Sequence, residues 1–371
     1  MADPEEASRR IERVAVLGTG FMGTSVAMAA ARAGASMTGW DIDPDTSARA
    51  ARRAGFAPAG SMQEAVLGAD LVVVCTPIGT IAPLAAAALA AAPGAIVTDV
   101  GSIKGSISRE VAALAAPDDL PRYVPGHPMG GSERSGPEHA SPSVVDGIVW
   151  VLSAAETTDP GSVDALEGWV ARLGARPVRM PPDRHDRLVA FVSHLPQVAS
   201  TALMGLAATE EADEPELLLL AAGGFRDLTR LAASDARLWS SILVANRDQI
   251  ADAIDLYVER LRGLREEVVG GRGEAVESMF AHAKEARLRL ATKPQVKAGV
   301  AVLQVEVPDR PGALARLTSI LAEGRVNIED LQIVHSPEGG RGTVHLTVAA
   351  DATGDATDVL VAGGFDPRRL A

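Results

Sequence analysis

The chain has 371 residues, of which 47% are hydrophobic and 22% are charged, and its formal net charge is −13. This length is sufficient for two or three globular domains. No block of Lys and Arg interrupts the acidic composition. Binding to nucleic acid or to an anionic membrane is therefore not expected, because both need a contiguous basic surface.

The cysteine content and the N-terminal segment predict a cytoplasmic protein. Cys75 is the single cysteine, so no intramolecular disulfide can form and a reducing compartment is expected. The segment Met1–Arg13 is polar and charged and has no apolar signal core. No apolar stretch has the length and flanks of a membrane span, so no membrane partner is expected.

Residues 1–180 alternate between short apolar runs and Ala-rich helical stretches. The runs that predict strands are Val14–Leu17, Ser36–Trp40, Leu71–Cys75, Ile96–Asp99 and Ile148–Leu152. The helical stretches include Thr24–Ala33 and Ile81–Ala91. Strands rich in Val and Ile that alternate with helices are typical of a parallel sheet covered on both faces. We therefore predict an α/β Rossmann-type dinucleotide-binding domain over residues 1–180.

Residues 181–292 have almost no strand signal, which predicts an all-helical substrate or dimerisation domain. Its longest helix is predicted to run from Asp235 to about Val269. One apolar stripe follows this helix at alternating steps of four and three residues. The stripe consists of Ile250, Ile254, Tyr257, Leu261, Leu264 and Val268. It fits an intramolecular core and a subunit interface equally well.

Residues 298–371 return to alternating strands and helices and predict a small α+β domain. The expected elements, in a βαββα order, are Val300–Val307, Pro311–Glu323, Val326–His335, Gly342–Val348 and Ala356–Ala362. A Pro-Glu-Gly-Gly turn is expected to join the second and third strands. This order predicts helices packed on one antiparallel sheet.

The first predicted strand enters a Gly-x-Gly-x-x-Gly turn formed by Gly18, Gly20 and Gly23. These glycines allow a tight turn, close approach to a pyrophosphate and close helix packing, while the helix N-terminus stabilises the anion. Asp41 ends the second strand, 18 residues after Gly23, and is expected to bind the adenine ribose hydroxyls. Since no Arg directly follows Asp41, NAD is favoured over NADP.

Four further residues are assigned to the same cofactor site. Phe21 and Met22 lie within the glycine turn, and Thr76 and Pro77 follow the strand that ends at Cys75.

Oxidation of an alcohol needs a group that takes the hydroxyl proton as the hydride leaves, and histidine has a suitable pKa. Of the seven histidines, His127 is the strongest candidate because a loop rich in Gly and Pro, residues 125–136, surrounds it. The sequence has no His-x-x-x-His pair and no cysteine cluster, so no metal site is expected.

A longer series of motifs resembles the prephenate and arogenate dehydrogenase family. It covers roughly residues 13–265 and comprises the glycine turn, Thr98–Lys104, His127-Pro128, Glu133, Ser135-Gly136, His185-Asp186, Ser193–Pro196, Phe225–Arg230, Trp239 and Asn246. This resemblance implies NAD-dependent oxidative decarboxylation of prephenate or arogenate, both cyclohexadienols, in tyrosine biosynthesis.

The resemblance also implies roles for individual residues. His127 accepts the hydrogen bond from the substrate 4-hydroxyl, Ser102 orients that pair, and Arg230 binds a substrate carboxylate. The remaining residues assigned to the substrate site are Glu133, His185, His194, Gln197 and Trp239. For each of these, a structural role on the surface or in the core remains an alternative.

Gln197 departs from the family pattern, in which a histidine often follows Ser-His-Leu-Pro. A histidine suits the keto-acid side chain of prephenate, whereas the amide oxygen of Gln197 can accept from the ammonium group of arogenate. Prephenate is the main interpretation, and arogenate remains the alternative.

The C-terminal segment Val307–Leu314, followed by Val326–Asp330, resembles the ACT domain, a βαββαβ amino-acid sensor. Gly312 at a helix start can expose backbone N–H groups to a carboxylate, and Asn327 is the usual partner across a domain interface. We expect regulation by tyrosine or phenylalanine and a homodimer or larger assembly. A purely structural module is the alternative.

Two rival interpretations differ in their chemistry. Other β-hydroxy-acid dehydrogenases use a lysine for the proton, and Lys104 is the only lysine before Lys284. A non-catalytic sensor of NAD and an amino acid would instead lack the catalytic set, yet Ser102, His127 and Arg230 are all present.

Overall fold

The chain forms two compact units, each described here by itself. A computed structural model describes residues 10–130, 135–291, 299–335 and 341–370. One unit contains Met1–Thr201 with Leu231–Leu256, and the other contains Ala202–Arg230 with Tyr257–Ala371. The predicted domain boundaries, 1–180, 181–292 and 298–371, stay a proposal.

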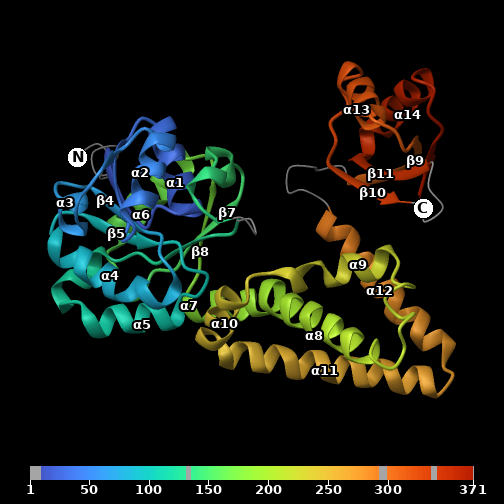
Figure 1. Cartoon of the computed structure of the whole chain (residues 1–371), viewed down its shortest axis with the longest axis horizontal. Helices are drawn as coiled ribbons and strands as arrows, with labels where there is room; N and C mark the ends of the chain where they lie inside the picture. The colour runs from blue at the N-terminus through green and yellow to red at the C-terminus, as the bar shows by residue number, and fades with distance from the viewer. Residues whose placement is uncertain (1–9, 131–134, 292–298, 336–340, 371) are drawn as a thin grey trace, which may run out of the picture. The chain divides into compact units, whose positions relative to one another are not determined.

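A parallel five-stranded sheet forms the centre of the first unit (Figure 1). In the order β3-β2-β1-β4-β5, its strands are Ala57–Pro58, Ser36–Trp40, Arg13–Leu17, Leu71–Val74 and Ile96–Asp99. The helices between them are α1 (Phe21–Arg32), α2 (Pro44–Ala54), α3 (Met62–Val66), α4 (Ile78–Ala91) and α5 (Gly105–Leu114). This confirms the Rossmann-type fold, and the order reverses between β1 and β4, where such sheets bind ligands.

The sheet is stabilised from both faces because the central strands are apolar on both sides. Every residue of β4 is buried. Val73 belongs to the apolar cluster on one face, with Trp150 and Trp169, while Val72 and Val74 belong to the cluster on the other face. An uninterrupted Leu-Val-Val-Val run is what a fully covered parallel strand requires.

A second, three-stranded sheet contains His127. Its strands are β6 (Gly126–Pro128), β7 (Val149–Leu152) and β8 (Arg176–Arg179), and α6 (Pro160–Arg172) joins the last two. β6 runs antiparallel to β7, with His127 opposite Val151. The expectation of an irregular loop around His127 is therefore wrong. Pro128 is compatible with pairing because β6 is the edge strand of its sheet.

The middle of the chain is helical, as predicted. Its helices are α7 (Pro182–Val189), α8 (Leu195–Glu210), α9 (Gly223–Thr229), α10 (Ala236–Ala245), α11 (Arg247–Val269) and α12 (Gly273–Ala291). A π-helical turn, Ala190–His194, separates α7 from α8. The single helix predicted from Asp235 to Val269 is wrong, since Asn246 breaks it with φ −114° and ψ 27°.

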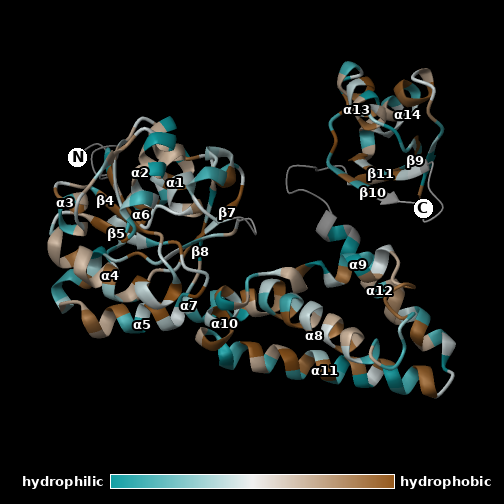
Figure 2. Cartoon of the chain, in the orientation of Figure 1, coloured by the Kyte–Doolittle hydropathy of each residue, from teal (hydrophilic) through white to brown (hydrophobic). Residues whose placement is uncertain are grey.

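The apolar stripe on α11 has two different environments. Near its start, Ile250 is 4% exposed and packs in a small core with Ala190 and Ala253. Farther along, Leu261 is 46% exposed and Val268 is 61% exposed, and Figure 2 shows apolar residues along this helix. The beginning of the stripe therefore belongs to the core, and its later part is left uncovered.

The C-terminal domain has the order βαββαβ. Its elements are β9 (Val300–Pro308), α13 (Ala313–Glu323), β10 (Asp330–His335), β11 (Arg341–Ala349), α14 (Thr353–Ala362) and β12 (Pro367–Arg369). The sheet order is β10-β11-β9-β12 with antiparallel pairs. The second strand begins at Asp330, four residues later than expected. The predicted turn at 337–340 lies outside the described residues.

One helical run passes a length and composition test for a membrane span. Residues Pro182–Glu210 have a mean hydropathy of 1.3 over their most apolar window. The same run contains buried His185, Asp186 and His194, which form a hydrogen-bonded network with other elements of the first unit. The first part of this run, up to His194, therefore belongs to the polar cluster of the first unit.

Candidate active site

The glycine turn between β1 and α1 leaves space only at its centre. Gly18 has φ +89°, and a Cβ there would lie 2.6 Å from the Cys75 carbonyl oxygen. A Cβ on Gly23 would lie 1.9 Å from the Gly18 oxygen, whereas a Cβ on Gly20 would meet nothing within 4 Å. The fold therefore requires glycine at positions 18 and 23. At Gly20 the space beside the backbone is open, which allows the pyrophosphate of a dinucleotide to approach it closely.

Asp41 lies beside this turn. Its carboxylate accepts hydrogen bonds from the backbone N–H groups of Thr19, at 2.7 Å, and Asp43, at 3.0 Å. A carboxylate has about four acceptor positions, so capacity remains for a ribose hydroxyl. The assignment of Asp41 to the ribose stays a prediction that fits this geometry.

The end of β4 adds a further polar group. Thr76 packs against the glycine turn. A Cβ added to Gly18 would lie 2.7 Å from the Thr76 Cγ2 atom. The Thr76 hydroxyl is buried and has no hydrogen-bond partner within the described part of the chain. A buried hydroxyl without a partner is costly unless a ligand supplies one. Pro77 precedes α4, and Phe21 and Met22 are half-buried at the start of α1.

Asp41→Asn should weaken NAD binding and reduce discrimination against NADP. The amide replaces the charge that repels a 2′-phosphate and offers fewer acceptors to the ribose, and we expect KM for NAD to rise about 10-fold. Initial rates with NAD and NADP measure the effect. Asp45→Asn, an exposed change in the first turn of α2, is the matched control. Unchanged KM values for both nucleotides would remove Asp41 from the site.

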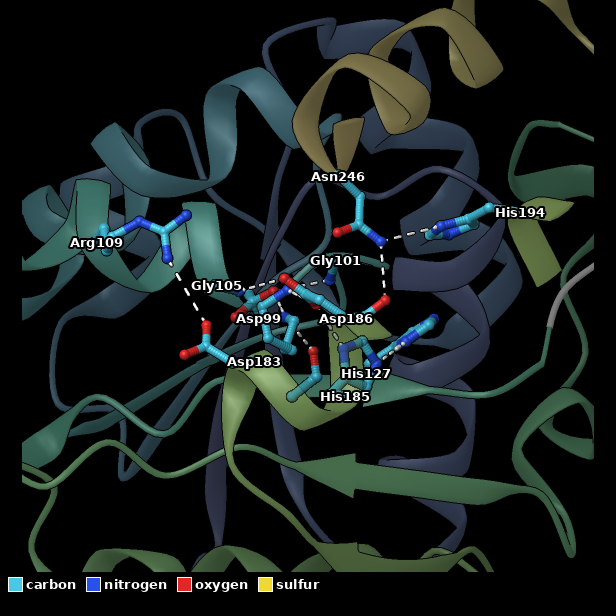
Figure 3. A network of polar contacts seen from close by, with 12 residues as sticks. Asp99, Gly101, Gly105, Arg109, His127, Asp183, His185, Asp186, His194 and Asn246 are labelled. Carbon is cyan, nitrogen blue, oxygen red and sulfur yellow. Dashed lines mark hydrogen bonds and ion pairs between the residues drawn. The ribbon is translucent and has the colours of Figure 1, made fainter. Parts of the chain in front are cut away.

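His127 belongs to a chain of three side chains (Figure 3). Its Nδ1 lies 2.8 Å from Nε2 of His185, and Nδ1 of His185 lies 2.8 Å from Oδ1 of Asp186. The two imidazole rings meet edge to face, with 5.0 Å between their centroids. The sequence predicts a polar role for His185 near the substrate, and the structure makes it the direct partner of His127.

The Asp186 carboxylate is held at the N-terminus of α5. It accepts from the backbone N–H of Lys104 at 2.8 Å and from that of Gly105 at 2.7 Å. The Asn246 side-chain amide donates to the Asp186 carbonyl oxygen at 2.9 Å and lies 3.2 Å from Nδ1 of His194. These contacts join α5, α7, the π turn and the α10–α11 junction into one polar cluster.

The π turn sets which side chains share a face. Asp186 and His194 are eight residues apart, and eight α-helical steps of roughly 100° leave two side chains about 80° apart. A π turn takes up one extra residue, so about seven steps remain and the offset falls to about 20°. The two side chains therefore lie on nearly the same face of the run, and Asn246 contacts the backbone carbonyl of Asp186 and the ring of His194.

Burial disfavours the charged forms of His127 and His194. Desolvation lowers the pKa of His127 well below its usual value, and the charges of His185, Lys104 and His194 lower it further. Desolvation likewise lowers the pKa of His194 to about 4. For Asp186, burial opposes ionisation, but hydrogen bonds from His185, Lys104 and Gly105 outweigh it and lower the pKa. At neutral pH, therefore, the His127 imidazole is uncharged and the Asp186 carboxylate is ionised.

Lys104 is a buried structural cation. Its side chain is fully buried and forms an ion pair with Asp99, and its Nζ donates to the Gly126 carbonyl oxygen at 2.6 Å. Tyr123 also donates to Asp99, at 2.8 Å. With its ammonium group enclosed in this way, Lys104 is not placed to take a proton from a substrate, which argues against the rival lysine mechanism.

Three further residues assigned to the site have mainly internal contacts. No hydrogen bond joins Ser102 to His127 in the described structure, where His185 holds that imidazole instead. Gln197 donates to the Leu231 carbonyl oxygen at 2.7 Å, and its amide oxygen accepts from Ser234 at 3.3 Å. Trp239 packs edge to face against His194, with ring centroids 6.0 Å apart.

The remaining assigned residues lie elsewhere. Arg230 belongs to the second unit, at the end of α9, and its substrate contact stays a prediction. Glu133 lies outside the described residues. In the C-terminal domain, Gly312 has φ +86° before α13, and exposed Asn327 donates to Glu329 at 2.5 Å. Their regulatory role also stays a prediction.

Sequence reasoning left out the groups that hold the cluster together. Asp99, Asp186 and Asn246 occur in the quoted motifs without a role, and Tyr123 lies outside those motifs. The His185-Asp186 dipeptide is a usable signal, because a carboxylate next to a histidine often orients an imidazole. Nothing in the local sequence indicates that Asn246 reaches Asp186 across 60 residues.

Known proteins match the whole arrangement. Three family profiles match in order: the prephenate dehydrogenase nucleotide-binding domain over residues 26–179, its dimerization domain over 181–284, and the ACT domain over 301–360. Prephenate dehydrogenase of Bacillus subtilis is 31% identical over 92% of this chain and 93% of its own length.

Solved structures agree with these matches. Prephenate dehydrogenase from A. aeolicus, in complex with hydroxyphenyl propionate and NAD+, has a TM-score of 0.71 and 27% identity, covering 76% of this chain and 98% of that one. Synechocystis arogenate dehydrogenase has a TM-score of 0.67 and 26% identity, covering 75% of this chain and 99% of its own. Since the similarity to the Bacillus enzyme extends over nearly the full length of both chains, and the three domains occur in the order that the fold displays, the chain belongs to the prephenate dehydrogenase family.

Proposed function

We propose that the protein is an NAD-dependent prephenate dehydrogenase, which converts prephenate to 4-hydroxyphenylpyruvate by oxidative decarboxylation in tyrosine biosynthesis. The observation that supports this most directly is the neutral, half-buried His127 imidazole, connected through His185 to the Asp186 carboxylate. β6 brings it past the end of β5, since a Cβ on Gly126 would lie 2.7 Å from the Asp99 carbonyl oxygen. Ligands bind at this edge of a parallel sheet.

The chain's own residues supply binding and proton transfer. Gly18, Gly20 and Asp41 hold the dinucleotide, whose nicotinamide provides the hydride acceptor when bound. His127 takes the 4-hydroxyl proton, so that the hydroxyl carbon becomes a carbonyl as its hydride leaves. The ring carboxylate then departs as carbon dioxide and the ring becomes aromatic. In this proposal Arg230 binds a substrate carboxylate.

Arogenate is the alternative substrate, and two observations bear on it. Gln197 replaces the histidine of the family pattern, and an arogenate dehydrogenase is among the similar structures. In this fold, however, the Gln197 amide oxygen already accepts from Ser234, so an ammonium group would compete with that contact. Prephenate therefore remains the main proposal.

A steady-state assay of NADH formation with prephenate and with arogenate tests the function. We expect kcat/KM to be higher with prephenate and NAD than with arogenate or NADP. A preference for arogenate would replace the main proposal by its alternative. Absence of NADH formation with both substrates, from protein that binds NAD and is folded, would contradict the proposed function.

We also propose that an aromatic amino acid, tyrosine or phenylalanine, regulates the enzyme through the ACT domain. The proposal is supported by the βαββαβ topology and by Gly312, whose positive φ precedes α13 and leaves N–H groups at the helix start. Millimolar tyrosine or phenylalanine should change the rate or raise the melting temperature. Gly312→Val, strained at this φ, should abolish the response. If neither amino acid changes rate or melting temperature, the proposal fails.

The proposed assembly is a homodimer or a larger homo-oligomer, in the cytoplasm. The dimerization-domain match and the uncovered apolar side chains of α11, such as Leu261 and Val268, support it. Sedimentation should give at least twice the mass of 38.3 kDa. Leu261→Glu should shift the distribution towards monomer, because a charge on a buried apolar interface is unfavourable. A monomer at micromolar concentration would contradict it.

A further inference from the structure

We propose that His185 and Asp186 act as positioning residues that set the tautomer of His127 and stabilise the positive charge it gains. This inference rests on the proposed function for its consequence in catalysis. Its geometry, however, is independent of the substrate. The three side chains come from β6 and α7, and each contact between them is 2.8 Å long.

The direction of the hydrogen bonds is determined at Asp186. Its two carboxylate oxygens accept from the backbone N–H groups of Lys104 and Gly105, so the carboxylate is bound as an ionised acceptor. It has no proton to donate. The Nδ1 atom of His185, 2.8 Å from Oδ1 of Asp186, must therefore be the atom that has the hydrogen.

The next contact follows from the first. The proposal takes His185 as a neutral imidazole, which has one N–H and one lone pair; with the hydrogen on Nδ1, its Nε2 is an acceptor. The Nδ1 atom of His127 lies 2.8 Å from it and must donate. This leaves the lone pair of His127 on Nε2, which is the only ring nitrogen free to accept a substrate proton. In the opposite tautomer, Nε2 would present a hydrogen and His127 would not be a base.

The same chain stabilises the product of proton transfer. When Nε2 of His127 accepts the hydroxyl proton, the ring becomes cationic and its Nδ1–H bond to His185 becomes charge-assisted. Transfer of the Nδ1 proton to Nε2 of His185 would place the charge beside Asp186, with one proton gained and one moved. This offsets the desolvation of His127 and the charge of Lys104, which both disfavour a cation on its ring.

The tautomer can be measured without any reaction. Side-chain ¹⁵N shifts of ¹⁵N-histidine-labelled holoenzyme distinguish Nδ1–H from Nε2–H, and the chain has only seven histidines. His127→Asn identifies the His127 signals. We expect the Nδ1–H form for both His127 and His185 at neutral pH. An Nε2–H form of His127 would overturn the proposal, whatever the activity of the protein.

Two substitutions at His185 separate positioning from packing. In His185→Gln, the amide oxygen can accept from His127 and preserve its tautomer, but it cannot take up a proton. His185→Leu has no acceptor. We expect kcat to fall roughly 10-fold with glutamine and roughly 10²- to 10³-fold with leucine, with KM for substrate changed less than about 3-fold. Equal losses in both variants would contradict the positioning role.

Asp186→Asn tests the carboxylate. The substitution removes the charge that stabilises the imidazolium and so lowers the pKa of His127. The acid limb of the plot of kcat/KM against pH should therefore move to lower pH. We also expect kcat to fall about 10²-fold or more. The groups that act on the charge of His127 are His185, Lys104 and His194, and the carboxylates Asp186 and Asp99 contact the first two of these. A lower kcat with an unmoved acid limb would indicate a merely structural role and would overturn the proposal.

Asp183→Asn is the matched control, because Asp183 lies one turn earlier on α7 and its side chain is 89% exposed. It should change neither kcat nor the acid limb. Failure of the proposed function would appear as absence of NADH formation in the unsubstituted enzyme. Failure of the positioning role would appear as an Nε2–H form of His127 in the ¹⁵N spectrum and as equal kcat values in His185→Gln and His185→Leu.

Discussion

His127→Asn should lower kcat by about 10²- to 10⁴-fold, the usual contribution of a positioned general base. His127 is a neutral imidazole in a chain of hydrogen bonds that ends at a carboxylate. An asparagine side chain preserves some of the polar contacts but cannot accept the substrate proton. NAD binding should change less than about 2-fold, since His127 contributes nothing to the glycine turn. Stopped-flow measurement of NADH formation and fluorescence titration with NAD separate these effects.

His139→Asn provides the control for this substitution. His139 is an exposed histidine in the segment that follows β6, and its replacement should leave kcat unchanged. Normal turnover in His127→Asn would remove the proposed base and, with it, the mechanism. A loss that affects NAD affinity as strongly as kcat would point to a distorted Rossmann domain.

Lys104→Met should destabilise the folded protein by about 3–5 kcal/mol, the usual consequence of removing one partner from a buried ion pair. Lys104 and Asp99 are both fully buried, and the methionine would leave the Asp99 carboxylate with two donors among the described residues, the Tyr123 hydroxyl and the Gly101 N–H. Loss of the Nζ contact to the Gly126 carbonyl oxygen also loosens the strand that contains His127. Chemical denaturation measures the free energy of unfolding.

The double substitution Asp99→Asn with Lys104→Met should recover part of this loss, because no uncompensated charge then remains. Arg109→Met is the control for an exposed pair. Arg109 and Asp183 are 3.8 Å apart with side chains 74% and 89% exposed, and its effect should be below about 1 kcal/mol. If Lys104→Met costs no more than Arg109→Met, the buried pair does not stabilise the domain.

The glycine turn was predictable because its requirements are local. Gly18 needs a positive φ and Gly23 needs the absence of a Cβ, and both follow from a strand that turns directly into a helix. The parallel sheet was predictable for a related reason, since its strands are apolar on both faces and separated by helical stretches. Motif order then indicated the family correctly.

The strand at His127 and the helix break at Asn246 were not predictable in the same way. Gly126, His127 and Pro128 have a loop-like composition, but pairing with β7 decides their conformation. Asn246 continues an apolar helical pattern, yet its buried amide contacts Asp186 and His194 and the helix ends there. Both outcomes depend on partners that are distant in the chain.

By itself, the amino-acid sequence determined the domain order, the dinucleotide turn and the family, and it singled out His127 as the candidate base, because each depends on residues adjacent in the chain or on a period along one element. Only the tertiary structure decided that His127, His185 and Asp186 form one hydrogen-bonded chain, that Lys104 is a buried counter-ion to Asp99, and that part of the α11 stripe is uncovered. The physical reason is that hydrogen-bond direction, burial and pKa depend on groups brought together from several elements, and no local pattern specifies which groups those are.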